Sequence, residues 1–315
     1  MMDNTFYFAP FHGITTRCFR RVFFSHFGGI DVALTPFFPA GEIHTLSEAR
    51  FSDAFPVNKE SIPLIIQIIG QKKQDMTDTI LYLYEKGYER INWNIACPMP
   101  QITRKKRGCG FMPFPDEIDE IVENICKKTT AKFSVKMRLG MYNPDESLEI
   151  INRLNNYPLD FIAVHARLGT QLYSGNTDRI SFEKCFQQSK NQLCYNGDIF
   201  SLADFHALQN LFPNLKAYML GRGLLQNPFL AEQIQGKVIS EEQQKKRFLT
   251  FYDDLTNTYL DIYPKGRALN RLKELWHYFA VFYNFSDVQL RSLLQITDCE
   301  HLIKQTNLII KKPFN

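Results

Sequence analysis

The sequence predicts a (β/α)₈ barrel followed by a small helical domain. Eight short runs of apolar, β-branched or aromatic residues recur along roughly the first 225 residues, and longer amphipathic segments separate them. After Ala231 the strand signal disappears and only helical periodicity remains. A chain of 315 residues has room for a barrel of about 250 residues and one appended unit.

The eight predicted strands alternate with predicted helices, so they must run parallel and be joined by crossover connections. An open doubly wound sheet is the main alternative. However, no GxGxxG motif follows the first strand, and polar residues follow many different strands, as they do in a barrel. The predicted strands span residues 6–9, 32–37, 64–70, 91–96, 133–139, 161–165, 192–196 and 218–221.

The segments between the strands have the pattern of amphipathic helices. In residues 116–128 the isoleucine and valine side chains lie on one face, and acidic residues precede lysines, as the helix dipole favours. Residues 145–154 and 201–209 follow the same pattern, and Ser201 is the expected N-cap of the second.

The last part of the chain is predicted to be entirely helical. We therefore divide the protein into a barrel domain, residues 1–237, and a helical domain, residues 238–315. The helices of the second domain are expected over residues 241–263, 266–283, 286–294 and 300–310.

Composition excludes several classes of protein. With 44% hydrophobic and 22% charged residues the chain is not disordered, and no apolar run approaches the roughly 20 residues that cross a bilayer. No secretory signal is visible, so we expect a cytoplasmic protein. The seven cysteines lack CxxC spacing, which argues against a disulfide framework and a zinc site. A net charge of +4 suits a polyanionic partner but is also common among other proteins.

Polar residues stand at the ends of most predicted strands, where a barrel builds its active site. A single histidine or glutamine in such a place is more often a core residue. Lys136, between Val135 and Met137, is different because a buried ammonium is costly without a partner or a function.

Two glycine turns, at Gly197 and at Gly221, follow the seventh and eighth strands. This is the recurring phosphate site of barrels, where backbone N–H groups meet an anion, and Arg222 would add a charged contact. A phosphate-bearing cofactor is therefore expected here, and two ordinary turns are the alternative.

The segment Asn94-Ile-Ala-Cys97-Pro98, followed by Gly108-Cys-Gly110, is specific enough to indicate a family. Together with the order of the other strand-end residues, it resembles the tRNA-dihydrouridine synthases, FMN enzymes that reduce uridine in RNA. The resemblance extends from Ala9-Pro10 to the helical C-terminal segment. It implies FMN as cofactor, NADPH or NADH as reductant and tRNA as partner, and we expect a monomer without a membrane attachment.

The resemblance also implies the residues that hold the cofactor. Lys136 would lie at the N1/O2 edge of the flavin, where an ammonium stabilises the negative charge of the reduced ring. The implied cofactor residues are Ala9, Pro10, Phe11, Gln67, Lys136, His165, Asn196, Gly197, Asp198, Gly221 and Arg222.

By the same resemblance, Cys97 donates a proton to uracil C5 after the reduced flavin has delivered hydride to C6. A thiol with an ordinary pKa of about 8.5 stays largely protonated near neutral pH. Cys109 is the rival, but the family usually has a small residue there rather than a functional thiol. Asn94, Arg167 and Tyr173 are the expected substrate-binding residues.

Three positions depart from the family pattern: Ala96 and Ala166 replace frequent glycines, and His12 replaces a small residue. None removes a reactive group. The basic run at residues 104–107 would contact the RNA backbone, with a solvated loop as the alternative. Residues 265–278 resemble the helical RNA-binding domain of the synthases, with a helix packed on the barrel as the alternative.

Two other functions stay open on the sequence. One is a different flavin barrel enzyme that reduces a free small molecule. The other is a non-catalytic RNA-binding protein that keeps the barrel as a platform, although the presence of Cys97, Lys136 and His165 together argues against it.

Overall fold

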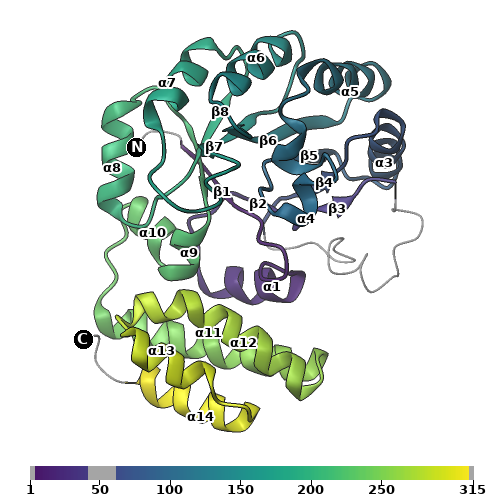
Figure 1. Ribbon diagram of the computed structural model, residues 1–315. Coiled ribbons are helices and arrows are strands. Elements are labelled where there is room, and N and C mark those ends of the chain that lie inside the picture. Colours follow the sequence, from purple (N-terminus) through teal and green to yellow (C-terminus); the bar gives the residue numbers. More distant parts are fainter. Residues whose placement is uncertain (1–3, 42–61, 312–315) are drawn as a thin grey trace.

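Eight parallel strands close into a barrel in the computed structural model, which describes residues 4–41 and 62–311 (Figure 1). Around the ring the order is β2-β1-β9-β8-β7-β6-β5-β4, and pairing of β2 with β4 closes it. A two-residue strand, β3 (Phe38–Pro39), pairs in addition with the end of β4. The predicted barrel is therefore confirmed.

Each predicted strand corresponds to one strand of the ring. Strand β2 ends earlier than expected, and β7 continues three residues further because it stays paired with the end of β6. The strands are β1 (Thr5–Phe8), β2 (Val32–Leu34), β4 (Leu64–Ile69), β5 (Arg90–Ile95), β6 (Lys132–Gly140), β7 (Ile162–Leu168), β8 (Leu193–Asn196) and β9 (Ala217–Leu220).

Helices surround the strands on the outside of the barrel (Figure 1). The side chain of Ser201 accepts a hydrogen bond from Asp204 N–H, and Asp204 reciprocates, so the predicted cap is confirmed. The helices of this part are α1 (Arg17–His26), α3 (Lys73–Glu85), α4 (Pro100–Thr103), α5 (Pro115–Lys128), α6 (Asp145–Leu154), α7 (Arg179–Gln188), α8 (Leu202–Leu211), α9 (Arg222–Gln226) and α10 (Leu230–Ile234), with a short 3₁₀ helix, η1 (Gly108–Phe111).

The alternation of side chains along each strand builds two separate cores. On β1, Phe6 and Phe8 face the helices, whereas Tyr7 belongs to a smaller cluster inside the barrel with Phe161 and Cys194. The outer core is much the larger. The interior is not wholly apolar, since polar side chains replace the apolar ones on β4, β5 and β6.

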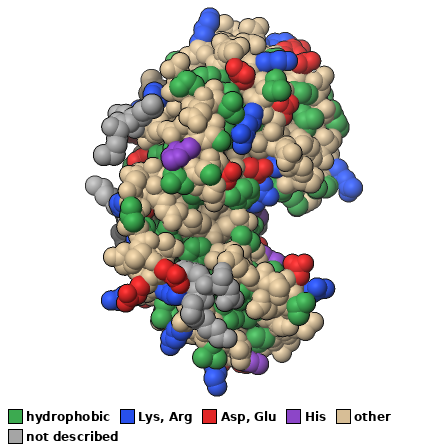
Figure 2. Space-filling view, turned by 90° about the vertical axis from the view of Figure 1, so that its left-hand side faces the viewer, with side chains coloured by type: hydrophobic (Ala, Val, Ile, Leu, Met, Phe, Trp, Pro, Cys, Tyr) green, Lys and Arg blue, Asp and Glu red, His purple; other side chains and the backbone are tan. Residues whose placement is uncertain are grey.

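Four helices follow the barrel: the first two pack against its α1 and α9, and the last two pack on these helices (Figure 1). The phenylalanines supply much of this contact: Phe251 lies 4.9 Å from Phe27 and 6.0 Å from Phe23, measured between ring centres. Figure 2 shows a hollow on one side between the barrel and this helical segment. The helices are α11 (Glu241–Ile262), α12 (Lys265–Phe282), α13 (Asp287–Leu294) and α14 (Cys299–Ile310).

None of the helices in the described part of the chain combines the length and the apolar character that a membrane crossing needs.

Glu232, on α10, ties the barrel to the helical segment. Its buried carboxylate accepts a hydrogen bond from Gly28 N–H at 3.0 Å and one from Arg247 Nη1, on α11, at 2.9 Å. Arg247 also donates to the carbonyl oxygen of His26 at 2.6 Å. Although burial opposes ionisation, these partners hold the pKa of Glu232 below its ordinary value of 4.5.

We expect Glu232→Gln to lower the free energy of unfolding by about 1–3 kcal/mol near neutral pH, because the amide loses the charged contact with Arg247. A carboxyl group whose pKa is lower in the folded state stabilises that state at pH values above its unfolded pKa. The stabilisation is lost as the pH falls through the folded pKa. Urea titrations from pH 7 to pH 3 should therefore show the free energies of unfolding of the wild type and Glu232→Gln converging. Glu300→Gln, at an exposed ion pair with Lys265, is the control and should leave the free energy of unfolding nearly unchanged.

Candidate active site

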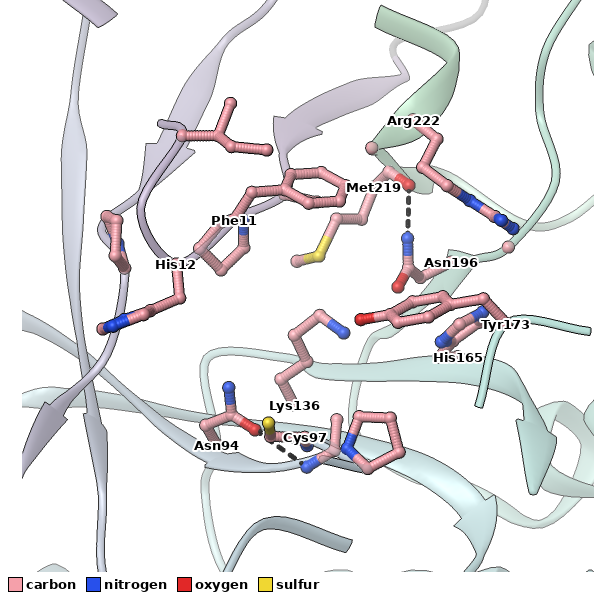
Figure 3. Close-up of a pocket in the computed structure, with 18 of the residues that line it drawn as sticks. Phe11, His12, Asn94, Cys97, Lys136, His165, Tyr173, Asn196, Met219 and Arg222 are labelled. Carbon is pink, nitrogen blue, oxygen red and sulfur yellow. Dashed lines mark hydrogen bonds between the residues drawn. The ribbon is translucent and has the colours of Figure 1, made fainter. Parts of the chain in front are cut away.

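A cavity of about 550 Å³ opens at the carboxyl ends of the strands, which is large enough for a small-molecule cofactor. Side chains from β1, β2, β5, β6, β7, β8 and β9 or the loops after them surround it (Figure 3). Helix α12 contributes Glu274 and Tyr278. The predicted site residues that line it are Ala9, Pro10, Phe11, Asn94, Cys97, Lys136, His165, Tyr173, Asn196, Gly197, Asp198, Gly221 and Arg222.

Two of the predicted residues lie outside the wall of the cavity. Gln67 is completely buried in the barrel beneath Asn94, and Arg167 is buried behind the loop that follows β7. Their expected contacts with the flavin and the substrate stay predictions.

The backbone around Cys97 is fixed on every side. The amide oxygen of Asn94 accepts hydrogen bonds from the N–H groups of Ala96 and Cys97, both at 2.9 Å (Figure 3). Arg138 Nε donates to the carbonyl oxygen of Ala96 at 3.0 Å. Cys109 N–H donates to the carbonyl oxygen of Cys97 at 3.0 Å. The chain therefore presents the thiol to the cavity from a rigid turn at the end of β5.

The glycines on both sides of Cys109 make this turn possible. Gly108 has a φ of +56°, and a Cβ there would lie 2.4 Å from the carbonyl oxygen of Cys97. A Cβ on Gly110 would lie 2.6 Å from the carbonyl oxygen of Thr103. The motif thus packs η1 directly against the backbone of Cys97.

The two thiols differ in exposure and ionisation. Cys97 is partly exposed and lines the cavity, whereas Cys109 is fully buried with its sulfur directed at Met141. Burial raises the pKa of Cys97, and the Met99 N–H with nearby cations offsets part of the rise. Burial raises the pKa of Cys109 to about 12. Both thiols are protonated at neutral pH, but only Cys97 can reach a ligand in this cavity.

Asn94 already uses most of its hydrogen-bonding groups within the protein. The two backbone N–H groups occupy both lone pairs of the Asn94 amide oxygen, and one amide hydrogen goes to Gln67 at 2.8 Å. One amide hydrogen therefore remains as a donor toward a ligand, which would suit a carbonyl oxygen.

Lys136, on β6, projects into the middle of the cavity (Figure 3). Within the residues that the structure describes, its ammonium makes no hydrogen bond or ion pair. Burial, and next the charge of Arg138, lower its pKa from 10.5 to about 8. A buried ammonium without a counter-ion is costly, so the site is suited to an anionic ligand.

His165, on β7 opposite Arg138 of β6, also lines the cavity and is held neutral. Burial lowers its pKa well below 6.5, and the surrounding cations, first Arg138 and then Lys136, lower it further. A neutral imidazole has one donor and one acceptor nitrogen for a bound ligand.

The side of the cavity after β8 and β9 carries paired charges. Asp198, whose φ is +41°, accepts from Arg167 and, at 2.8 Å, from Arg222. Its carboxylate would repel a phosphate but it holds both guanidinium groups in place. The ring of Tyr173 lies 5.4 Å from the guanidinium of Arg138 and 5.3 Å from that of Arg222.

The glycines at this side are required by close packing. Gly197 has a φ of +135°, and a Cβ there would lie 2.8 Å from Thr177. A Cβ on Gly223 would lie 2.0 Å from the carbonyl oxygen of Ile199. The turns that follow β8 and β9 are therefore closely packed, and one carboxylate faces two guanidinium groups where the sequence predicts a phosphate.

Several residues that line the cavity are not among the predicted site residues. Arg138 could have been found, because it stands two residues after Lys136 on the same strand and so faces the same way. Glu274 and Tyr278 are one helical turn apart, but no local signal indicates that α12 reaches the mouth of the barrel.

Comparisons with known proteins agree on one family. The model of the dihydrouridine synthase family matches residues 7–309. The tRNA-dihydrouridine(16) synthase of Aquipseudomonas alcaligenes is 24% identical over 310 residues, which cover 93% of this chain and 96% of that protein. The tRNA-dihydrouridine synthase B of Pasteurella multocida is 26% identical over 231 residues, 73% of this chain and 68% of that protein.

Solved structures give the same fold. A structure of morphinone reductase superposes with a TM-score of 0.54 at 10% identity, covering 76% of this chain and 88% of that one. Histamine dehydrogenase from Rhizobium sp. 4-9 gives 0.54 at 15% identity, covering 79% of this chain and 49% of that one. At such low identity this likeness concerns the barrel alone.

Proposed function

The chain belongs to the dihydrouridine synthase family, and from this premise we propose that it reduces uridine in tRNA to dihydrouridine with a bound flavin. The observation that carries the proposal is the pairing of a protonated, accessible thiol, Cys97, with a buried ammonium, Lys136, in one cavity. We further propose FMN as the flavin and NADPH or NADH as the reductant.

The residues of the cavity fit FMN in charge and in size. Arg222 and the backbone of the turns at Gly197 and Gly221 would hold its phosphate, and Ala9 to Phe11, His165 and Asn196 would line its ring system. Asn196 itself is fixed, because its amide donates to the carbonyl oxygen of Met219 at 2.8 Å. When bound, the reduced flavin supplies the hydride that uracil C6 accepts.

The protein's own residues then have two tasks. Cys97 gives its proton to C5 of the uracil, which its fixed backbone and protonated state both favour. Lys136 stabilises negative charge on the ligand that lies against it, because its ammonium faces the cavity without another partner in the described chain. The remaining amide hydrogen of Asn94 would donate to a uracil carbonyl oxygen.

We assign the RNA to the space between the two parts of the chain. Residues 1–237 would form the catalytic domain, and residues 238–315 the helical RNA-binding domain, whose Tyr278 and Glu274 already reach the cavity. A single chain supplies both surfaces, so we propose a monomer. As a tRNA-modifying enzyme it would act in the cytoplasm.

The test of this function is Cys97→Ala. The variant should bind FMN and tRNA and accept electrons from nicotinamide at the wild-type rate, yet form dihydrouridine about 10²-fold more slowly or worse, because it lacks the acid. Anaerobic flavin reduction, followed by reoxidation on adding unmodified tRNA, measures the two half-reactions separately. Cys109→Ala is the matched control and should stay near wild type. Wild-type reoxidation by Cys97→Ala, or a crippled Cys109→Ala, would show that the acid is misassigned.

Lys136 should make FMN binding depend on pH. The anionic ring of reduced FMN beside this ammonium would raise the pKa of Lys136 from about 8, so binding of reduced FMN takes up a proton above that pH and its affinity falls as pH rises through about 8. Lys136→Met should weaken binding about tenfold at pH 7 and remove this slope. Lys132→Met, at an exposed position of the same strand, is the control for anaerobic binding titrations with reduced FMN. An unchanged slope in Lys136→Met would mean that this lysine does not face the cofactor.

The basic run divides into two pairs. Lys106 forms an ion pair with Glu117 at 2.6 Å and lies over the ring of Phe114, and Arg107 donates to Gln71 at 2.7 Å. Arg104 and Lys105 are exposed.

We therefore expect Arg104→Gln with Lys105→Gln to weaken tRNA binding and to lower the slope of log affinity against log salt by about 1–2. Lys106→Gln with Arg107→Gln should change that slope less, because these cations already have partners in the protein. Filter binding between about 50 and 200 mM salt distinguishes the pairs. Equal slopes for all three proteins would place the RNA on another surface.

A further inference from the structure

Three side chains inside the barrel have no part in the mechanism above. Ser134, Asn92 and Gln67 are completely buried, and the strand register places them side by side across three neighbouring strands, with Gln67 opposite Asn92 and Asn92 opposite Ser134. Layers inside such barrels are usually filled by branched apolar side chains. Polar groups at this depth are costly unless each is hydrogen-bonded.

These residues and Asn94 form a continuous row of hydrogen bonds, here called the amide chain. Asn92 Nδ2 donates to Ser134 Oγ at 2.9 Å, and Gln67 Nε2 donates to Asn92 Oδ1 at 2.8 Å. Asn94 Nδ2 donates to Gln67 Oε1 at 2.8 Å. At its lower end Ser134 Oγ donates to the carbonyl oxygen of Ile91 at 3.3 Å. At its upper end Asn94 accepts from the backbone of Ala96 and Cys97.

The amide chain has only one workable direction. Two backbone N–H groups face Asn94, so its oxygen must point to them and its nitrogen to Gln67. That choice fixes the orientation of Gln67, which in turn fixes that of Asn92. Turning any one amide over would bring donor against donor or acceptor against acceptor, which costs about 1–3 kcal/mol for a buried group.

We propose that Asn92 and Ser134 are positioning residues for Cys97, and that they act through Gln67 and Asn94. They touch neither substrate nor cofactor. They hold the Asn94 amide in the one orientation that fixes the N–H groups of Ala96 and Cys97, and so they determine where the thiol lies. The inference rests on the proposed function for its catalytic consequence but not for its geometry.

The test compares Asn92→Ala and Ser134→Ala with Ser147→Ala. Ser147 is an equally buried serine on α6, where its hydroxyl donates to the carbonyl oxygen of Pro144 at 2.6 Å, outside the cavity wall. The two serine variants remove the same group from equally buried positions. Thermal melting of each variant measures the purely structural loss.

The first measurement needs no activity. Iodoacetamide alkylation of Cys97 in the protein without added ligands, followed by mass spectrometry of its peptide, should be about threefold faster or more in Asn92→Ala, because the freed turn exposes the thiol more often. A smaller increase is expected for Ser134→Ala, and none for Ser147→Ala.

The second measurement separates the half-reactions. Flavin reduction by NADPH should be unchanged in all three variants, and so should KM for tRNA. Reoxidation by tRNA should slow about tenfold or more in Asn92→Ala, since a small displacement of a reacting group is enough for such a loss. Ser134→Ala should slow it less, and Ser147→Ala should match the wild type.

If Asn92→Ala and Ser134→Ala behave like Ser147→Ala in alkylation and reoxidation, the amide chain does not position Cys97. If Asn92→Ala does not fold, the test depends on Ser134→Ala alone. Ser147→Ala is then the control with a matched melting temperature. If the wild type forms no dihydrouridine, the proposed function fails, and the alkylation rates still decide the inference.

Discussion

Closure of the barrel by the hydrogen bonds between β2 and β4 is the constraint on which the rest of the structure depends. It brings the carboxyl ends of eight strands into one ring, so residues far apart in the sequence, such as Phe11, Cys97 and Arg222, share one cavity. It also confines the interior to a narrow cylinder that admits no bulk water. Each side chain inside must therefore be apolar or hydrogen-bonded. A buried charge with neither property destabilises the empty site until a ligand binds to it.

The charges of the site follow from this confinement. Asp198 is committed to Arg167 and Arg222, so it does not compensate Lys136. The result is a surplus of positive charge around a neutral His165, held in a place that water screens weakly. The mutual repulsion of these charges destabilises the empty site. A bound anion removes this repulsion, so an anionic ligand is the one that the site stabilises most. Burial thus turns one lysine into a binding determinant for the phosphate-bearing, reducible cofactor that we propose.

The sequence could predict what depends on local pattern. Strand alternation and helical periodicity located the elements, and the strand predicted over residues 91–96 ends directly before Cys97. Local pattern does not predict how deep in the barrel a side chain lies. Gln67 and Lys136 are both inward-facing polar residues, yet only Lys136 lines the cavity. The register of β4 against β5 decides this, and register depends on the closed ring. The contribution of α12 likewise depends on tertiary packing rather than on periodicity.

Cys97 is held from two opposite directions, and the methyl group of Ala96, where the resemblance leads us to expect a glycine, interferes with neither. The amide chain fixes the N–H groups of Ala96 and Cys97 from inside the barrel, and the Gly108 turn fixes the carbonyl oxygen of Cys97 from outside. Arg138 holds the carbonyl oxygen of Ala96. All these bonds involve backbone groups, so the methyl group of Ala96 disturbs none of them and instead lines the cavity. The substitution therefore changes the shape that a bound ring meets, while the position of the thiol is set by contacts that the methyl group does not touch.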